Sequence, residues 1–244
     1  MEVYLFGAVV AFVAGMVQGC AGFGLGMTSA PCLMLITTPA VAVPTILSLS
    51  LVNSLVVTLH ARRHLLWRLV GPLALGSILG APLGIYALRV LDPNLLKCCV
   101  AVLILLFAAA LLAGWSRPLR RPHRALLPLG FFSGILGGST SMSGPPVILF
   151  LTNQDTPKDV FRANLITYFF IEGVFTLIIY LAWGMYTLDV ARFAVALVPA
   201  MLLGTVAGIH LSSRVPEQTF RRVVLVGITL MGVLLLITSL RALA

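Results

Sequence analysis

The chain has 244 residues, of which 60% are apolar and only 9% are charged. Because soluble domains carry about 25% charged residues, this composition, with a mean hydropathy of +1.09, excludes a soluble enzyme domain and indicates a polytopic membrane protein. The net charge of +9 does not indicate nucleic-acid binding, since the basic residues stand in short loops between apolar runs, where they are a topology signal.

Apolar runs of membrane-spanning length follow one another along the chain, with two interrupted regions among them. In chain order we predict a Gly-rich hairpin over residues 3–37, three spans, a second hairpin over residues 127–151, and three more spans. Each span is close to the roughly 20 residues that a helix needs to cross a bilayer. The predicted spans are 40–59, 69–91 and 95–114 in the first half and 161–183, 192–211 and 221–240 in the second.

Each hairpin has a short apolar arm on either side of a Gly- or Ser-rich break. The breaks are predicted at residues 19–26 and 138–144. At 1.5 Å per residue the arms reach only about 10 to 24 Å, which is less than the roughly 30 Å of a hydrocarbon core. We therefore expect each hairpin to enter and leave the membrane on the same side.

Landmarks recur in the two halves of the chain at a nearly constant spacing. Gly19 and Gly138 are 119 residues apart, and so are Asn53 and Glu172. A constant offset across both halves predicts an internal repeat within a single membrane domain. The predicted repeats are residues 1–118 and 125–244.

The basic residues decide between two arrangements of these repeats. If the hairpins cross the membrane, the protein has eight spans and the 16 Lys and Arg residues divide nine to seven between its two sides. If the hairpins are re-entrant, the division is twelve to four, with Arg89, Lys97, Arg192 and Arg241 on the minority side. Basic residues of short loops accumulate on the cytoplasmic side. We therefore predict inverted repeats with both termini outside and the Arg117–Arg124 linker in the cytoplasm.

The two hairpin breaks are the predicted substrate site. Inverted repeats with interrupted helices are typical of secondary transporters, whose site lies where the broken backbones meet. The second arm of each hairpin would direct its N-terminal NH groups and positive dipole end at the site, and hydroxyl and amide groups would add neutral donors suited to a small oxyanion. The predicted binding residues are Gln18, Gly22, Gly24, Gly26, Thr28, Asn53, Ser139, Thr140, Ser141, Ser143, Gly144, Arg162 and Asn164. The alternative is that Gly and Ser only allow tight helix packing, which we favour for the Gly80/Gly84 and Gly204/Gly208 pairs.

These motifs resemble those of a known family. The run from Gln18 to Gly26, its degenerate copy ending Ser143-Gly144-Pro145-Pro146-Val147, and the Pro-led helix after each resemble the sulfite exporter family of TauE/SafE type, over essentially the whole chain. The resemblance implies a multi-pass transporter of the bacterial inner membrane that moves small sulfur-containing anions such as sulfite or organosulfonates, usually outward and without ATP. It implies no enzyme activity.

Three side chains each have two interpretations. Glu172 is the only acid well inside a predicted span, which makes it a candidate for proton coupling or a structural carboxylate satisfied by hydroxyls such as those of Tyr168 and Tyr180. Arg162 either attracts the anion or anchors a helix end at the membrane interface. Cys20 is either a thiol nucleophile or a small buried residue.

The function that we predict is export of a small sulfur anion by alternating access, through movement of the repeats, with proton coupling as an option. An anion channel with the same site, and a membrane thiol protein acting through Cys20, are the alternatives. No cofactor or metal is predicted, because His60 and His64 lack a third ligand and are typical of an interfacial basic cluster. The expected partners are the anion and the lipid bilayer, and a homodimer is left open.

Overall fold

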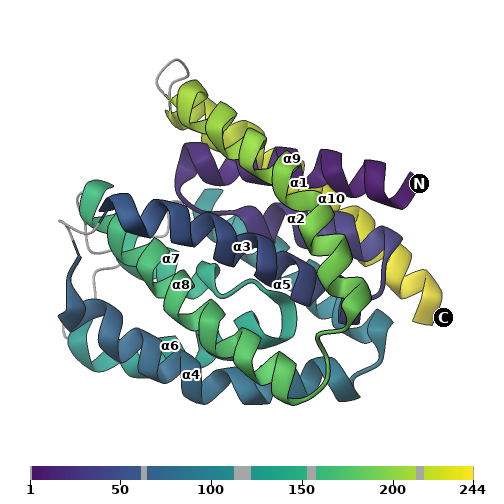
Figure 1. Cartoon of the computed structure of the whole chain (residues 1–244), viewed down its shortest axis with the longest axis horizontal. Coiled ribbons are helices and arrows are strands. Elements are labelled where there is room, and N and C mark those ends of the chain that lie inside the picture. Colours follow the sequence, from purple (N-terminus) through teal and green to yellow (C-terminus); the bar gives the residue numbers. More distant parts are fainter. Residues whose placement is uncertain (1, 62–64, 113–121, 153–157, 213–216, 244) are drawn as a thin grey trace.

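The computed structural model shows the chain as a bundle of helices (Figure 1). The structure describes residues 2–61, 65–112, 122–152, 158–212 and 217–243, and within these ranges it contains no strand. The side chains of His60 and His64, and residues 113–121 of the predicted linker, lie outside what is described. The helices are α1 (Glu2–Ala21), α2 (Leu25–Ile36), α3 (Pro39–Ala61), α4 (Trp67–Val90), α5 (Pro93–Leu112), α6 (Pro122–Thr140), α7 (Gly144–Thr152), α8 (Lys158–Ala182), α9 (Leu188–Ser212) and α10 (Glu217–Leu243).

Each run that the sequence marks as a span corresponds to one helix. Helices α3, α4 and α5 occupy the three runs of the first half, and α8, α9 and α10 those of the second, with ends that differ by a few residues. Five segments of the described chain are long and apolar enough to cross a bilayer: Glu2–Ala21, Trp67–Val90, Pro93–Ala110, Val160–Ala182 and Leu188–Leu211. The chain is therefore an all-α, multi-pass membrane protein.

The first arm of each hairpin is longer than the sequence suggested. Helix α1 has 20 residues and α6 has 19, whereas the second arms, α2 and α7, have 12 and 9. At 1.5 Å per residue α1 extends about 30 Å, the thickness of a hydrocarbon core. The expectation of two short arms was wrong because Gly19 and Gly138 remain helical, so that only residues 22–24 and 141–143 separate the arms.

Left-handed residues form both breaks. In the first break Gly22 and Gly24 have φ angles of 82° and 107°, a region that residues with a Cβ rarely adopt. In the second break Ser141 has a φ angle of 55°. A non-Gly residue in this conformation costs roughly 1–2 kcal/mol. The Ser141 hydroxyl offsets part of this cost by donating a hydrogen bond of 2.7 Å to the carbonyl oxygen of Val43 on α3.

Glycines hold the first arm of each hairpin against a helix of the other half. A Cβ at any of these glycines would meet a backbone carbonyl oxygen of the partner helix, so α4 packs backbone to backbone on α6, and α1 does so on α9. Small residues at four-residue spacing permit this approach in membranes. The glycines are Gly76, Gly80 and Gly84 on α4, Gly130, Gly134 and Gly138 on α6, Gly15 and Gly19 on α1, and Gly204 and Gly208 on α9. The packing interpretation of the Gly80/Gly84 and Gly204/Gly208 pairs therefore agrees with the structure.

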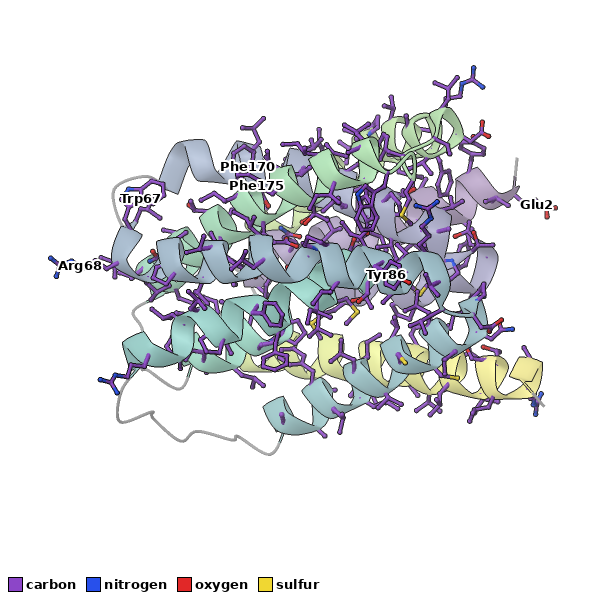
Figure 2. All side chains as sticks on the ribbon, turned by 90° about the horizontal axis from the view of Figure 1, so that it is seen from below. Glu2, Trp67, Arg68, Tyr86, Phe170 and Phe175 are labelled. Carbon is purple, nitrogen blue, oxygen red and sulfur yellow. The ribbon has the colours of Figure 1, made fainter. Side chains whose placement is uncertain are left out.

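Several other helix contacts also have counterparts in which the two halves are exchanged. Helix α3 packs on α8 and α5 on α10, and the contact of α3 with α9 matches that of α8 with α4. Both termini lie at the same end of the bundle (Figure 1). Trp67 and Arg68, at the start of α4, lie at the end opposite Glu2 (Figure 2).

A substitution at Gly80 tests the backbone contact between α4 and α6. Gly80→Ala should lower the Tm of the purified protein in detergent, because the new Cβ would meet the Phe131 carbonyl, and overpacking typically costs about 1–3 kcal/mol. Gly71 on the same helix is the control, since nothing lies within 4 Å of where its Cβ would stand. Gly71→Ala should leave the Tm unchanged or raise it. Equal losses of Tm in both variants would contradict the packing account.

Candidate functional site

A cavity of about 40 Å³ lies between the two breaks, the middle of α3 and the middle of α8. One water molecule needs roughly 10–15 Å³ of such space, so the cavity has room for a group of about three or four small atoms. A sulfite-sized oxyanion is of this size. Seven residues singled out from the sequence line the cavity, and they come from both hairpins and from α8: Gln18, Gly24, Gly26, Ser141, Ser143, Gly144 and Glu172.

The two breaks touch at Gly26. This glycine lies in the first turn of α2, and a Cβ on it would meet the backbone carbonyl oxygen of Ser141 in the other break. The contact between the hairpins therefore requires glycine at position 26, because a residue with a Cβ does not fit there. Any larger residue here would force the two breaks apart and change the shape of the cavity.

The N-terminus of α2 supplies backbone donors to the cavity. Leu25, Gly26 and Met27 are the first residues of α2 and line the cavity, and Gly24 before them gives the helix no side-chain cap. The first NH groups of a helix have no acceptor within it, and they carry the positive end of the helix dipole, about half an elementary charge. This end of α2 is therefore suited to an anion.

Helix α7 contributes fewer donors than α2, although the sequence suggested equivalent roles. It begins at Gly144, and the next two residues are Pro145 and Pro146. Proline has no backbone NH group, so two of the NH groups that normally mark a helix N-terminus are missing here. The backbone donors of the cavity are therefore concentrated on the first hairpin.

The hydroxyl groups of the second break already donate to protein atoms. The hydroxyl of Ser139 bonds the Ile135 carbonyl, that of Thr140 bonds Leu136, that of Ser141 bonds Val43, and that of Ser143 bonds Glu172, at 2.7, 2.7, 2.7 and 3.3 Å. A hydroxyl has only one proton to donate. These hydroxyls therefore have no further proton to donate to an anion in this arrangement, although Ser141 and Ser143 line the cavity.

Buried polar atoms of the first half, in contrast, lack hydrogen-bond partners. Gln18 Nε2, Thr28 Oγ1, Asn53 Nδ2 and Ser54 Oγ are buried, and no described group bonds them. An unsatisfied buried donor costs about 1–3 kcal/mol, which indicates that a ligand or water belongs beside it. Of these residues, Gln18 lines the cavity and is only 4% exposed. Its amide is the strongest side-chain candidate for an anion donor.

Glu172 forms part of the cavity wall and is held by two hydroxyls. Thr176 donates to Oε1 at 3.2 Å and Ser143 donates to Oε2 at 3.3 Å, and the residue is 4% exposed. The tyrosine hydroxyls have other partners: Tyr168 donates to Ser133 at 2.8 Å, and Tyr180 donates to the Gly138 carbonyl at 2.6 Å. The carboxyl is thus tied to the second break through Ser143, and not to the tyrosines considered in the sequence analysis.

Arg162 lies outside the cavity and packs against the first break. Its Nη2 donates to the carbonyl oxygen of Gly19 at 3.0 Å, and a Cβ on Gly22 would contact its side chain. A cation beside the last carbonyls of α1 satisfies the negative end of that helix. Arg162 therefore does not line the cavity in this structure, and its Nε is buried without a partner.

The remaining sequence candidates also lie outside the cavity lining. Asn164 accepts from the Leu66 NH at 2.7 Å and donates to the Val160 carbonyl at 2.6 Å, which ties α8 to the start of α4. Asn53 accepts from the Thr205 hydroxyl at 3.0 Å. Cys20 is a free, half-buried thiol that does not line the cavity. The others outside the lining are Gly22, Thr28, Ser139 and Thr140.

Several lining residues were missed by the sequence analysis. They are Leu25, Met27, Leu47, Ser50, Leu51, Met142, Ile148, Phe169 and Gly173. Ser50 and Phe169 are also 119 residues apart, one helical turn before the Asn53 and Glu172 pair. Because side chains three or four residues apart share a helix face, extending that pair by one turn would have found these two. The apolar lining residues carry no such signal.

The family model of the sulfite exporters TauE/SafE matches residues 7–235, which include both hairpins and the cavity between them. The chain belongs to this family. Members of the family are transporters and not enzymes, and this chain is accordingly a transporter.

One curated relative resembles the chain over most of its length. The chain is 28% identical over 228 residues to a protein of Cupriavidus necator named "Probable sulfite/organosulfonate exporter TauE", and the match covers 86% of each chain. No solved structure matches the chain significantly.

The contrast between the two breaks predicts opposite results for two substitutions. Gln18→Leu should weaken anion binding about 10- to 100-fold, because a hydrogen bond to a charged group contributes about 1.5–3 kcal/mol. Its Tm without ligand should not fall, since the substitution removes an unsatisfied buried amide. Ser139→Ala is the matched control and should bind as wild type, because its hydroxyl bonds its own helix. Isothermal titration with sulfite measures both, and a larger loss in Ser139→Ala would reverse the assignment.

Proposed function

We propose that the protein exports small sulfur-containing anions, sulfite or an organosulfonate, and that the anion binds in the cavity between the two breaks as it crosses the membrane. The observation that carries the proposal is the convergence on one cavity of the free NH groups at the start of α2 and the unpartnered amide of Gln18. The cavity volume of about 40 Å³ suits the sulfur oxyanion head group. The name of the Cupriavidus necator relative supports the same substrate class.

Transport in this proposal proceeds by alternating access, with moving units that each combine the two halves of the chain. Helix α1 is packed backbone to backbone on α9, and α6 on α4, so neither first arm is free to move with the remainder of its own repeat. Interlocked backbones resist sliding because any displacement brings a carbonyl against a Cα. The units that rock against each other around the cavity are therefore the α1–α9 pair and the α4–α6 pair, rather than the repeats of the sequence analysis.

Glu172 is the residue that we propose for proton coupling. It is the ionisable side chain in the described lining, and its ionised form repels an anion in the same cavity. Protonation removes this repulsion, so proton binding and anion binding favour each other. Ser143 of the second break donates a hydrogen bond to the carboxyl of Glu172. A change in the protonation of Glu172 therefore acts directly on this break.

Flux measurements in proteoliposomes test the transport proposal. Purified protein should release loaded sulfite with a rate that saturates with concentration, and unlabelled sulfite outside should accelerate the exit of labelled sulfite. These two properties are expected of a carrier. A flux that never saturates and shows no such exchange would favour the anion channel, and no flux above empty liposomes would reject both.

Reporter fusions test the proposed orientation. In this orientation the protein lies in a bacterial inner membrane, its two halves are inverted, and both termini lie outside the cytoplasm. The twelve-to-four basic split supports it, and both termini lie at the same end of the bundle, as it requires. Alkaline phosphatase fused after Ala244 should be active, whereas the same enzyme fused after Arg117 should be inactive. A cytoplasmic fluorescent reporter that is bright after Ala244 would overturn the orientation.

A further inference from the structure

The cavity is lined by neutral donors from the first hairpin and by a carboxyl from α8. Its donors are the NH groups at the start of α2 and the Gln18 amide, and Glu172 is the single ionisable side chain among the described residues that line it. The nearest cation of the first break, Arg162, is held outside the lining by its bond to Gly19. No Lys or Arg of the described lining therefore offsets the charge of a bound anion.

Neutral donors and cations discriminate differently between singly and doubly charged anions. The attraction between an anion and fixed dipoles grows in proportion to the charge of the anion. The cost of removing the anion from water grows with the square of that charge, so a dianion costs about four times as much as a monoanion of the same size. A cavity that lacks a cation thus offers less attraction to set against the larger desolvation cost of a dianion.

Glu172 strengthens this discrimination when it is ionised, and it does not offset the charge of the anion when it is protonated. When ionised, it repels a dianion twice as strongly as a monoanion. When protonated, it still supplies no positive charge. In both states a carboxyl oxygen retains a lone pair beyond those bonded by Ser143 and Thr176, and this lone pair can accept a hydrogen bond from the ligand. A protonated oxyanion therefore has a donor for the ionised carboxylate, whereas a fully ionised one presents only acceptors to it.

We propose that the cavity selects singly charged oxyanions, so that hydrogen sulfite and sulfonates are its ligands and the sulfite dianion and sulfate are not. The selection rests on the proposed transport of sulfur anions through this cavity and adds the charge state to it. The oxygens that carry the charge lie at the α2 NH groups and the Gln18 amide. The protonated oxygen of hydrogen sulfite, or the organic substituent of a sulfonate, lies toward Glu172.

A pH test must distinguish the titration of the ligand from the titration of other groups near the cavity. Tyr168 and Tyr180 flank Glu172 on α8, and Arg162 and Cys20 lie at the outer side of the first break. The two breaks and helices α1, α2, α3 and α7 contribute only neutral residues to the described lining. A reference ligand whose own charge does not change with pH corrects for all of these groups.

Competition in proteoliposomes provides the test. The half-saturating concentrations of sulfite and of methanesulfonate are measured on the same purified protein between about pH 5 and pH 8.5. Methanesulfonate keeps one negative charge throughout, so it reports the titration of the protein alone. The ratio of the sulfite value to the methanesulfonate value should be constant at low pH. It should then rise about tenfold per pH unit once the sulfite dianion predominates. Sulfate should not compete at either end of the range.

The outcomes separate the charge selection from transport itself. A ratio that stays flat at high pH, or sulfate that competes as well as methanesulfonate, would overturn the charge selection and leave anion transport standing. Failure of both sulfite and methanesulfonate to bind would reject the proposed function together with it. In Glu172→Gln, sulfate should compete better relative to methanesulfonate than in wild type, while the exposed-site control Asp189→Asn should keep the wild-type ratio. An unchanged ratio in Glu172→Gln would remove the role given to the carboxyl.

Discussion

Replacing Gly26 with alanine should reduce anion binding by at least about 100-fold. The new Cβ would meet the Ser141 carbonyl oxygen, and backbone on both sides prevents a cheap adjustment. The two breaks would separate, and the NH groups at the start of α2 would lose their position. Two or three hydrogen bonds to a charged ligand, each contributing about 1.5–3 kcal/mol, account for a loss of this size. Isothermal titration with sulfite on the purified variant measures it.

Gly80→Ala is the control for this experiment. It introduces a backbone collision of the same kind between α4 and α6, at a glycine that does not line the cavity. It should therefore lower the Tm but leave the Kd for sulfite within about twofold of wild type, because sites that share no partners act independently. If Gly26→Ala binds as wild type, or if both variants lose affinity equally, the contact between the breaks does not form the site.

Replacing Glu172 with glutamine should uncouple transport from the pH gradient. Glutamine resembles the protonated carboxyl in shape and charge, so the cavity should still bind anion and exchange labelled for unlabelled sulfite. Net flux driven by a pH gradient should fall to the level without a gradient, because the variant has no proton to bind or release at this position. Parallel flux assays with and without an imposed gradient measure the difference.

Asp189→Asn is the matched control for the loss of one carboxylate. Asp189 is an exposed residue at the start of α9 that pairs with Arg192 at 3.9 Å. Its substitution should leave the response to the gradient intact, because an exposed ion pair of this kind contributes little. A Glu172→Gln variant that keeps the full response would identify Glu172 as a structural carboxylate.

The fold could largely be predicted from the sequence because the membrane imposes simple rules. A span must be about 20 apolar residues long, and the runs of this length coincide with helices in the structure. The hairpin arms were less predictable because a glycine can either break a helix or let it pack closely on a neighbouring helix. Gly22 and Gly24 break the helix with positive φ angles, whereas Gly19 remains helical beside the backbone of Thr205. Which role applies depends on the neighbouring helix, which the local sequence does not contain.

The meeting of the two hairpins could be predicted from the sequence, but the contribution of each hairpin to the cavity could not. The sequence predicted that the two glycine-rich breaks meet, and Gly26 and Ser141 of these breaks touch in the structure. The sequence could not show that the hydroxyl of Ser143 already bonds Glu172, because hydrogen-bond partners depend on tertiary packing. For the same reason the unpartnered amide of Gln18 and the position of Arg162 against Gly19 required the structure.

A crystal structure of the protein with selenite tests the central claim, an anion site between the two breaks, most directly. Selenite has the shape and charge states of sulfite, and its selenium is located by anomalous scattering. We predict a selenium peak in the cavity, with selenite oxygens about 3 Å from the backbone nitrogens of Gly26 and Met27 and from the Gln18 amide. A cavity without selenium, together with a selenium peak at Arg162 outside it, would contradict the account.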